Sequence, residues 1–266
     1  MTTEDFNIWA ASQKKLPRPP TDKELAAFRE FLDAPPSDVW RHAKRIGAFY
    51  IKPFAHSRVD IFWFVLGDAV NNLTSQNDKL AGLVLKLQCL PDGKGVLGPE
   101  PWWSDLPYFN NFWSEWMQFQ FDDLPMSSRD FEINRQANIN RNAFLAKITA
   151  NMGKVMVLDQ RQRGGHTLKQ ALERTPISEA AILATEPWIT YCADTIYDRS
   201  LQGGLMSYEH PHNGTNWGVQ KGWSKARWQY WKKRFQEIST AKLSEEVRRL
   251  AKGCAERMDT VEKAKG

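Results

Sequence analysis

Apolar residues recur at spacings of three and four along most of this 266-residue chain. The pattern is clear at Leu80, Leu83, Val84 and Leu87, and again within residues 247–261. A helix with about 3.6 residues per turn places such residues on one face, whereas strand-like alternation is essentially missing. The spacing therefore predicts an all-α fold, which we expect to be a single irregular bundle of roughly orthogonal helices.

Caps and helix-breaking residues predict where the helices begin and end. Thr21 with Glu24 forms a capping-box pattern before the first of them, and Gly203-Gly204 ends a strong one. The predicted helices span about residues 21–34, 38–50, 58–73, 77–90, 109–121, 130–152, 186–202, 224–238 and 244–261. The last two should form an antiparallel C-terminal hairpin, and residues 155–158 could be a strand or a loop.

The domain organisation follows from the prolines and glycines. Residues 1–20 end in Leu16-Pro17-Arg18-Pro19-Pro20 and are expected to form a flexible tail. Residues 91–107 form an irregular connection rich in proline and glycine. We do not expect this connection to divide the chain, because neither half alone would close its apolar faces. Residues 21–266 are therefore predicted to be a single helical domain.

Several classes of protein are disfavoured by the sequence. Residues 1–22 lack the apolar core of a signal peptide. The longest clean apolar run, residues 61–67, is far shorter than the roughly 20 residues that span a bilayer. Cys89, Cys192 and Cys254 have no metal-binding spacing and are expected to be buried free thiols in a reducing compartment. We expect an intracellular, cytoplasmic protein with no membrane partner.

Five motifs, in a fixed order, resemble a known family. They are Trp103-Ser104-Asp105-Leu106-Pro107, Asn142-Ala143-Phe144-Leu145-Ala146, Glu186-Pro187-Trp188-Ile189, Ser224 with Trp228 and Trp231-Lys232-Lys233-Arg234-Phe235, and Leu243-Ser244-Glu245. Together they resemble a large ascomycete family catalogued only as a domain of unknown function. The resemblance runs from about Phe28 to Val261. The resemblance implies a helical domain of a filamentous fungus. It implies no activity, cofactor or catalytic residue. This chain departs from the pattern at Lys147, where an arginine is expected, and in a longer, histidine-rich loop at 203–223.

The 12 tryptophans are the most unusual feature of the composition. They could fill gaps between short helices, since a buried indole brings a large apolar body and one N–H that needs a partner. Alternatively, several could line an apolar pocket for a flat small molecule, with Trp63 and Trp188 as substrate-binding candidates. The sequence leaves both interpretations open.

Polar residues near Trp188 are candidates for chemistry. Tyr191, Asp194 and Asp198 lie within the same predicted helix, and the two aspartates share a face. Such a pair is usually solvated, but a buried carboxyl could act as a general acid. On that hypothesis Asp194 and Tyr191 are the catalytic candidates and Asp198 a substrate-binding one.

The histidines are a weaker signal. His210 and His212 flank a proline, and neutral imidazole is a common metal ligand, but two histidines fix no third ligand. We therefore predict no metal and assign both to substrate binding. His166 follows Gly164-Gly165 at a predicted helix start, where backbone N–H groups could hold an anion, although a capping turn is the simpler interpretation.

The net charge of +5 comes largely from residues 221–266, which carry 13 basic and 6 acidic side chains. Because these charges flank an aromatic stripe, they are typical of the solvent-exposed face of a helix whose other face packs in the core. Nucleic-acid binding is therefore not expected. The sequence favours a small-molecule-binding protein with a Trp-rich pocket and no cofactor, and allows a cofactor-independent enzyme of fungal specialised metabolism. Its ligand would be apolar or aromatic. The alternative is a protein-interaction or regulatory module without catalysis; the oligomeric state is open.

Overall fold

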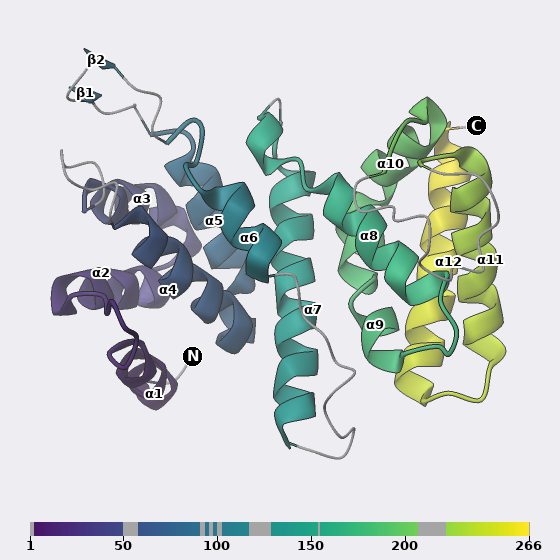
Figure 1. Cartoon of the computed structure of the whole chain (residues 1–266), viewed down its shortest axis with the longest axis horizontal. Helices are drawn as coiled ribbons and strands as arrows, with labels where there is room; N and C mark the ends of the chain where they lie inside the picture. The colour runs from purple at the N-terminus through teal and green to yellow at the C-terminus, as the bar shows by residue number, and fades with distance from the viewer. Residues whose placement is uncertain are drawn as a thin grey trace. The chain divides into compact units, whose positions relative to one another are not determined.

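The computed structural model describes residues 3–49, 58–90, 94–95, 98–99, 103–116, 129–153, 155–206 and 222–265. These residues form the predicted all-α fold (Figure 1). The exceptions are two strands of two residues each, β1 (Lys94–Gly95) and β2 (Gly98–Pro99), which pair antiparallel. None of the described helices is both long and apolar enough to cross a bilayer.

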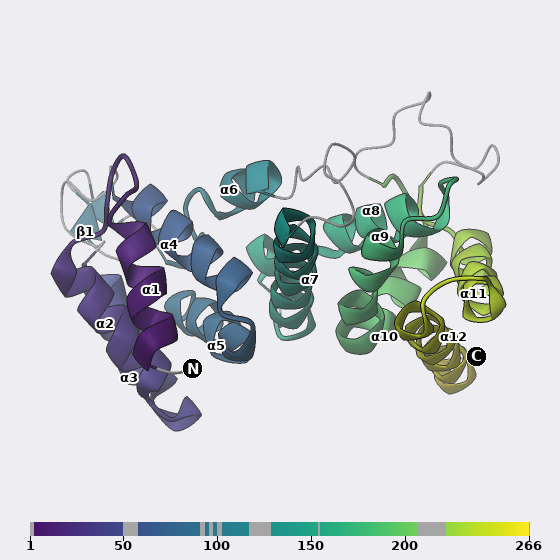
Figure 2. The same ribbon diagram turned by 90° about the horizontal axis from the view of Figure 1, so that it is seen from below.

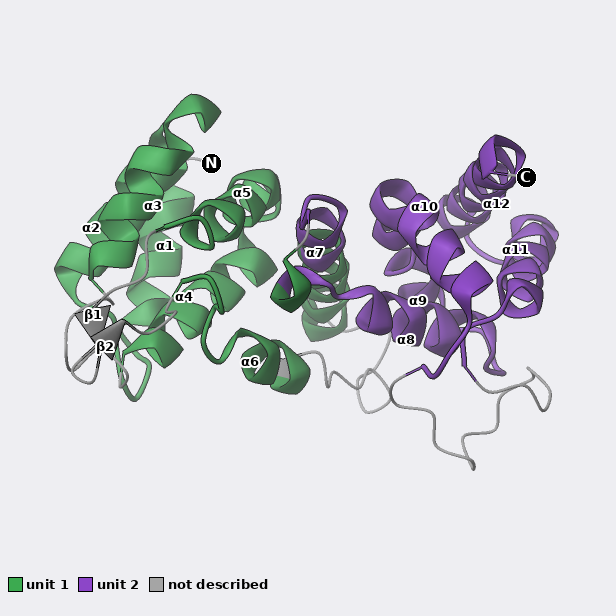
Figure 3. Cartoon of the chain, turned by 90° about the horizontal axis from the view of Figure 1, so that it is seen from above, with its two compact units in different colours: residues 1–144, 155–157 green, residues 145–154, 158–266 purple. Residues whose placement is uncertain are grey.

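The chain divides into two compact units (Figure 3). Unit 1 comprises residues 1–144 and 155–157, and unit 2 comprises residues 145–154 and 158–266. The division falls inside the long helix α7 (Arg129–Ala150) and not in the connection at 91–107. Because one helix contributes to both units, the single domain predicted for residues 21–266 stays a prediction.

Unit 1 contains the N-terminal helices and the first part of α7. They are α1 (Thr3–Gln13), α2 (Asp22–Asp33), η1 (Pro36–Asp38), α3 (Val39–Ala48), α4 (Val59–Asn72), η3 (Thr74–Gln76), α5 (Asn77–Leu87) and α6 (Phe109–Trp116). The capping box predicted for α2 is confirmed: Glu24 N donates to Thr21 Oγ1 at 3.3 Å, and Thr21 N donates to the Glu24 carboxylate at 2.6 Å. Local capping therefore sets the start of α2.

Helix α1 lies in the segment for which the sequence predicted a flexible tail. Its Phe6 and Trp9 are buried, and the Trp9 indole N–H donates to Asp68 Oδ2 of α4 at 2.8 Å. Gln13 Nε2 donates to the same carboxylate at 2.5 Å. Two buried aromatic side chains and the shared acceptor Asp68 hold α1 against α4. The proline-rich sequence that follows α1 gives no sign of this packing.

Aromatic rings form the centre of unit 1. Trp63 of α4 is fully buried, with ring centroids 4.7 Å from Phe62 and 5.2 Å from Phe109. Trp113 of α6 stacks on Phe144 of α7 with centroids 4.9 Å apart. These rings pack edge to face or stacked, which is how aromatic cores gain energy beyond burial.

Unit 2 contains the C-terminal end of α7 and five further helices, of which α10, α11 and α12 lie side by side (Figure 2). They are α8 (Arg161–Leu172), α9 (Glu179–Leu183), α10 (Glu186–Gln202), α11 (Lys225–Thr240) and α12 (Glu245–Lys265). The bounds predicted for α10 are confirmed, and it ends where Gly203 adopts a φ of 72°. Residues 155–158, expected to be a strand or a loop, include the 3-10 helix η4 (Met156–Leu158), most of which belongs to unit 1.

Helix α8 corrects the prediction that a helix starts near His166. It begins at Arg161, so Gly164 and Gly165 lie inside it. A Cβ on Gly164 would come within 2.6 Å of the Trp188 ring, and one on Gly165 within 2.5 Å of the Trp223 ring. The glycines therefore admit indoles against the backbone of α8 and are not a capping turn or an anion site.

A buried ion pair connects α8 to α11. The Arg227 guanidinium donates to both carboxylate oxygens of Glu173, at 2.7 and 2.8 Å, and both side chains are almost completely buried. The Trp231 indole N–H donates to the same carboxylate at 2.8 Å. Because every oxygen and the charge are matched, the pair is tolerated in the interior of unit 2.

Polar contacts also join α11 to α12. Lys232 Nζ contacts Asp259 at 2.8 Å and Glu262 at 2.7 Å, and the Trp228 indole N–H donates to Glu262 at 2.6 Å. Burial alone would raise the pKa of Glu262, but the hydrogen bonds from Lys232 and its neighbours hold it below the usual value. The two helices are therefore fixed by partly buried charges as well as by their apolar faces.

Candidate functional site

The two tryptophans predicted to bind substrate lie in different units. Trp63 is in α4 of unit 1, where its indole N–H donates to the carbonyl oxygen of Pro107 at 2.7 Å. Trp188 is in α10 of unit 2 and packs on Gly164. Both are completely buried, as are Trp103, Trp113, Trp228 and Trp231. These indoles fill the interiors of the units, which is the first of the two interpretations of the tryptophan content.

The catalytic candidates lie on the outer surface of α10. Asp194 contacts Arg257 of α12 at 2.7 Å, and Asp198 contacts Lys265 at 2.6 Å. Each carboxylate is about half exposed, so these are surface ion pairs rather than a buried general acid. Tyr191 is 44% exposed. The structure thus assigns the two aspartates a linking role, and catalysis by Asp194 or Tyr191 stays a prediction.

The histidine candidates cannot be placed in the same way. His210 and His212 lie outside the described residues. Within the described part of the chain, no three His, Cys, Asp or Glu side chains are arranged to hold a metal ion.

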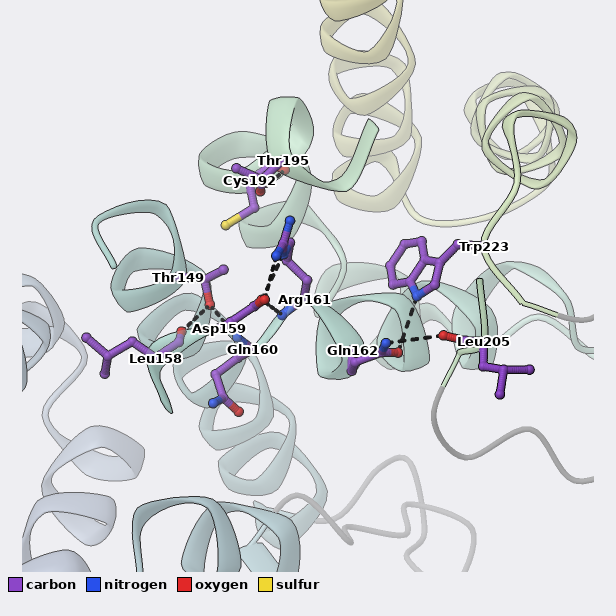
Figure 4. Close-up of polar contacts among 10 residues, drawn as sticks. All are labelled: Thr149, Leu158, Asp159, Gln160, Arg161, Gln162, Cys192, Thr195, Leu205 and Trp223. Carbon is purple, nitrogen blue, oxygen red and sulfur yellow. Dashed lines mark hydrogen bonds and ion pairs between the residues drawn. The ribbon is translucent and has the colours of Figure 1, made fainter. Parts of the chain in front are cut away.

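A polar junction holds the start of α8 against the end of α7 (Figure 4). The Gln160 backbone N–H donates to Thr149 Oγ1 at 3.2 Å. Arg161 donates to both oxygens of Asp159, at 2.8 and 2.5 Å. Burial would raise the pKa of Asp159, but these hydrogen bonds hold it below its usual value and raise that of Arg161. Beside this junction, burial raises the pKa of the Cys192 thiol to about 12, so the thiol is protonated and not a nucleophile.

Gln162 of α8 fixes the chain on both sides of residues 207–221 (Figure 4). Its Nε2 donates to the Leu205 carbonyl at 3.3 Å, and its Oε1 accepts from the Trp223 indole N–H at 3.2 Å. The Trp223 backbone N–H also donates to the Gly204 carbonyl at 2.8 Å. These contacts hold Gly204, Leu205 and Trp223, which precede and follow the undescribed residues that include His210 and His212.

A groove of about 420 Å³ lies between α10 and α12 of unit 2. Its lining comes from Glu186, Ile189 and Thr190 of α10 and from Glu246, Arg249, Leu250, Gly253, Cys254 and Arg257 of α12. Ile189 and Cys254 are buried at its floor, and the charged residues stand around it. An apolar floor with a polar rim is typical of a ligand-binding site.

Gly253 of α12 contributes bare backbone to the lining of the groove. A Cβ on Gly253 would find no atom within 4 Å, so the space above it is open. Next to it, burial and the nearby Glu186 charge raise the pKa of the Cys254 thiol well above its usual value. The thiol therefore contributes a small, neutral and apolar surface to the groove floor.

The charges of the groove are only partly paired. Arg257 contacts Asp194, and Glu186 accepts a hydrogen bond from the Thr190 hydroxyl at 2.9 Å. Glu186 and Glu246 lie in the first turns of their helices, where the helix dipole favours a negative charge. Arg249 is exposed and has no hydrogen bond or ion pair with any described residue.

The sequence placed candidate residues on α10, but none of the candidates within the described residues lines the groove. Trp188 and Tyr191 are next to the lining residues Ile189 and Thr190 in the sequence, and Asp194 pairs with Arg257. Gly253, Arg249 and Arg257 were missed. Their signal is a glycine in the middle of an amphipathic helix, with an arginine four residues to each side.

The comparisons with known proteins concern the family alone. The family model described as "Protein of unknown function (DUF3632)" matches residues 63–235, which run from α4 to α11 and include parts of both units. No curated protein and no solved structure showed significant similarity to the chain. Since the family model covers well over half of its length, the chain belongs to the DUF3632 family of proteins of unknown function.

Proposed function

We propose that this protein binds an apolar or aromatic small molecule in the groove between α10 and α12. The observation that carries the proposal is the open space of about 420 Å³ around Gly253, above a floor of Ile189, Leu250 and Cys254. Small-molecule sites usually enclose about 300–1,000 Å³ and combine an apolar surface with a few polar groups. The groove has a volume in this range and both kinds of surface, and it is open to solvent on one side.

This proposal keeps the ligand class expected from the sequence but moves the site. A Trp-lined pocket requires indole faces that are free to contact a ligand, whereas the six fully buried tryptophans pack against other side chains. Aliphatic side chains and a thiol, rather than indoles, offer the apolar surface of the groove.

The proposal is for binding without chemistry at the groove. Cys254 is the nucleophilic residue type at its floor, and burial keeps this thiol protonated. A cofactor-independent enzyme of fungal specialised metabolism therefore remains an expectation from the sequence, and it would need a reactive group other than Cys254.

The experiment compares two leucine substitutions on α12. Gly253→Leu fills the groove, whereas Lys252→Leu adds the same side chain at an exposed neighbouring position outside the groove. The readout is the fluorescence of a neutral probe, 1-aminoanthracene, which increases in an apolar site. We expect binding by the natural protein and by Lys252→Leu, and at least a ten-fold weaker affinity in Gly253→Leu. Circular dichroism verifies that both variants fold.

Two results would end the proposal. One is that the natural protein does not bind the probe at all. The other is that Gly253→Leu, folded, binds the probe as tightly as Lys252→Leu does, because the probe would then occupy a different site.

A second candidate, a protein-interaction module, draws support from unit 1. Phe64 of α4 is 45% exposed and contacts Phe112 of α6 edge to face, with centroids 5.2 Å apart. Exposed aromatic residues are frequent anchors in interfaces. If Phe64 mediates self-association, light scattering should detect a concentration-dependent dimer that Phe64→Ser abolishes; a monomer at all concentrations would remove this version of the candidate.

A further inference from the structure

Helix α12 presents an Arg-Gly-Arg row to the groove. Arg249, Gly253 and Arg257 follow one another at intervals of four residues, and all three line the groove. Residues four apart share a helix face, and at ~1.5 Å per residue the Cα atoms of the two arginines are about 12 Å apart along the axis. The two arginines therefore lie one helical turn before and one turn after Gly253, beside which the groove is open.

The two arginines differ in how they are paired. Arg249 has no hydrogen bond or ion pair with any described residue. Arg257 pairs with Asp194 at 2.7 Å, and their side chains are 43% and 49% exposed. An ion pair that is this exposed is weak and exchanges readily. The guanidinium of Arg249 is therefore available to bind an anion. The guanidinium of Arg257 becomes available when its ion pair with Asp194 breaks.

The acidic residues of the groove determine where an anion would bind. Glu186 and Glu246 line the part of the groove formed by the first turns of α10 and α12. An anion there would meet like charge, whereas Gly253 lies one helical turn from each of the two arginines that line the groove. Electrostatics therefore favours an anionic group at Gly253, with the ligand's apolar body over Ile189 and Leu250.

From this arrangement we propose that the ligand is a monocarboxylic acid with an apolar or aromatic body, an inference that rests on the proposed function. Its carboxylate binds over Gly253, between Arg249 and Arg257, and its body covers the apolar floor. A single negative charge matches Arg249, the groove-lining arginine that has no hydrogen bond or ion pair with a described residue. A dianionic phosphate would add a second negative charge close to Glu186, Glu246 and Asp194 and is disfavoured.

The same geometry gives Asp194 a role. Its carboxylate competes with the ligand for Arg257, so it weakens the binding of carboxylates without affecting neutral ligands. Removing this competition should strengthen carboxylate binding. A merely structural role for Asp194 would not distinguish between two ligands that differ only in charge.

The test uses two compounds with the same body, 4-phenylbutyrate and 4-phenylbutan-1-ol, each displacing 1-aminoanthracene from the full-length protein. We expect the carboxylate to bind at least ten-fold more tightly than the alcohol, as a charge-assisted contact to arginine implies. Arg249→Gln should bring the two affinities within about two-fold of each other. Arg248→Gln, an exposed neighbour outside the groove, should leave them unchanged. Asp194→Asn should raise the carboxylate affinity several-fold and leave the alcohol unaffected.

The outcomes separate this inference from the proposed function. If the alcohol binds as tightly as the carboxylate, or if Arg249→Gln alters nothing, while Gly253→Leu still blocks both compounds, the carboxylate inference is wrong and the groove remains the site. If neither compound displaces the probe, and the affinity of the probe is the same in Gly253→Leu as in the natural protein, both proposals fail. A carboxylate affinity that falls in Asp194→Asn contradicts the proposed competition.

Discussion

Two glycines inside helices of unit 2 should respond in opposite ways to the same substitution. Gly164 of α8 faces the Trp188 ring, where an added Cβ would approach Cε3 at 2.6 Å and Cδ2 at 2.8 Å. Gly253 of α12 faces open space, with no atom within 4 Å of an added Cβ. We therefore predict that Gly164→Ala destabilises the protein and that Gly253→Ala stabilises it.

The magnitude follows from two terms. Replacing glycine by alanine inside a helix favours the helix by about 0.8–1.0 kcal/mol, and this gain applies at both positions. At Gly164 the rigid indole of Trp188 must move, and overpacking a well-packed interior typically costs about 1–3 kcal/mol. Since the helix term cancels in the comparison, the two variants should differ by about 1–3 kcal/mol, with Gly253→Ala the more stable.

Urea unfolding followed by circular dichroism measures this difference from the transition midpoints at equal slopes. Both sites lie in unit 2, so the comparison holds even if the two units unfold in separate steps. If Gly164→Ala proves as stable as Gly253→Ala, Trp188 does not pack on the backbone of α8. The explanation of the Gly164-Gly165 pair given above would then be wrong.

Three further predictions concern buried and exposed groups. Glu173→Gln should lower the free energy of unfolding by about 3–5 kcal/mol, because Arg227 keeps its charge in the interior without a partner; a loss below about 1 kcal/mol in a urea titration would contradict the buried pair. Burial, reinforced by neighbouring cations, lowers the pKa of His166 from 6.5 to about 4. The unfolded chain thus takes up a proton that the folded protein resists, so stability should fall as the pH drops from 6.5 towards 4. His166→Gln should flatten this decline, and an unchanged pH profile would refute the assignment. Cys89 is exposed and the other two thiols are buried, contrary to the expectation that all three are buried, so a thiol reagent should modify one cysteine quickly and Cys89→Ser should abolish that phase; two fast thiols would contradict the structure.

The sequence predicted those helices whose signals are local. The apolar spacing placed α4, α5 and α12 close to their observed bounds, and Thr21 with Glu24 marked the start of α2 correctly. These signals act within a few residues, so they do not depend on what packs against the helix.

The helices that were missed owe their existence to distant partners. Glycine pairs usually break a helix, yet α8 continues through Gly164 and Gly165 because two indoles from far along the chain pack there. Helix α1 was assigned to a flexible tail although Phe6 and Trp9 are buried. Propensity alone cannot reveal either case, because tertiary packing overrides it.

The candidate site shows the same limit. The sequence located Asp194 and Tyr191 on α10, but which face of α10 meets α12 depends on packing between residues more than 60 positions apart, of which the pairs Asp194–Arg257 and Asp198–Lys265 are examples. In that packing Ile189 is buried and lines the groove, whereas Tyr191 is exposed and does not line it. Spacing within one helix predicts which residues share a face, but it does not predict which partner that face contacts.

The buried tryptophans occupy space beside helices, so their positions exclude a ligand from those places. An indole is large and rigid, and α8 accepts Trp188 and Trp223 against its backbone because Gly164 and Gly165 carry no Cβ. A glycine that already receives an indole has no room for a ligand. Gly253 differs because its own helix presents arginines on both sides and no ring enters the space above it. Among the described glycines inside helices of unit 2, Gly253 is the one that faces no indole, and it lines the groove proposed to hold the ligand.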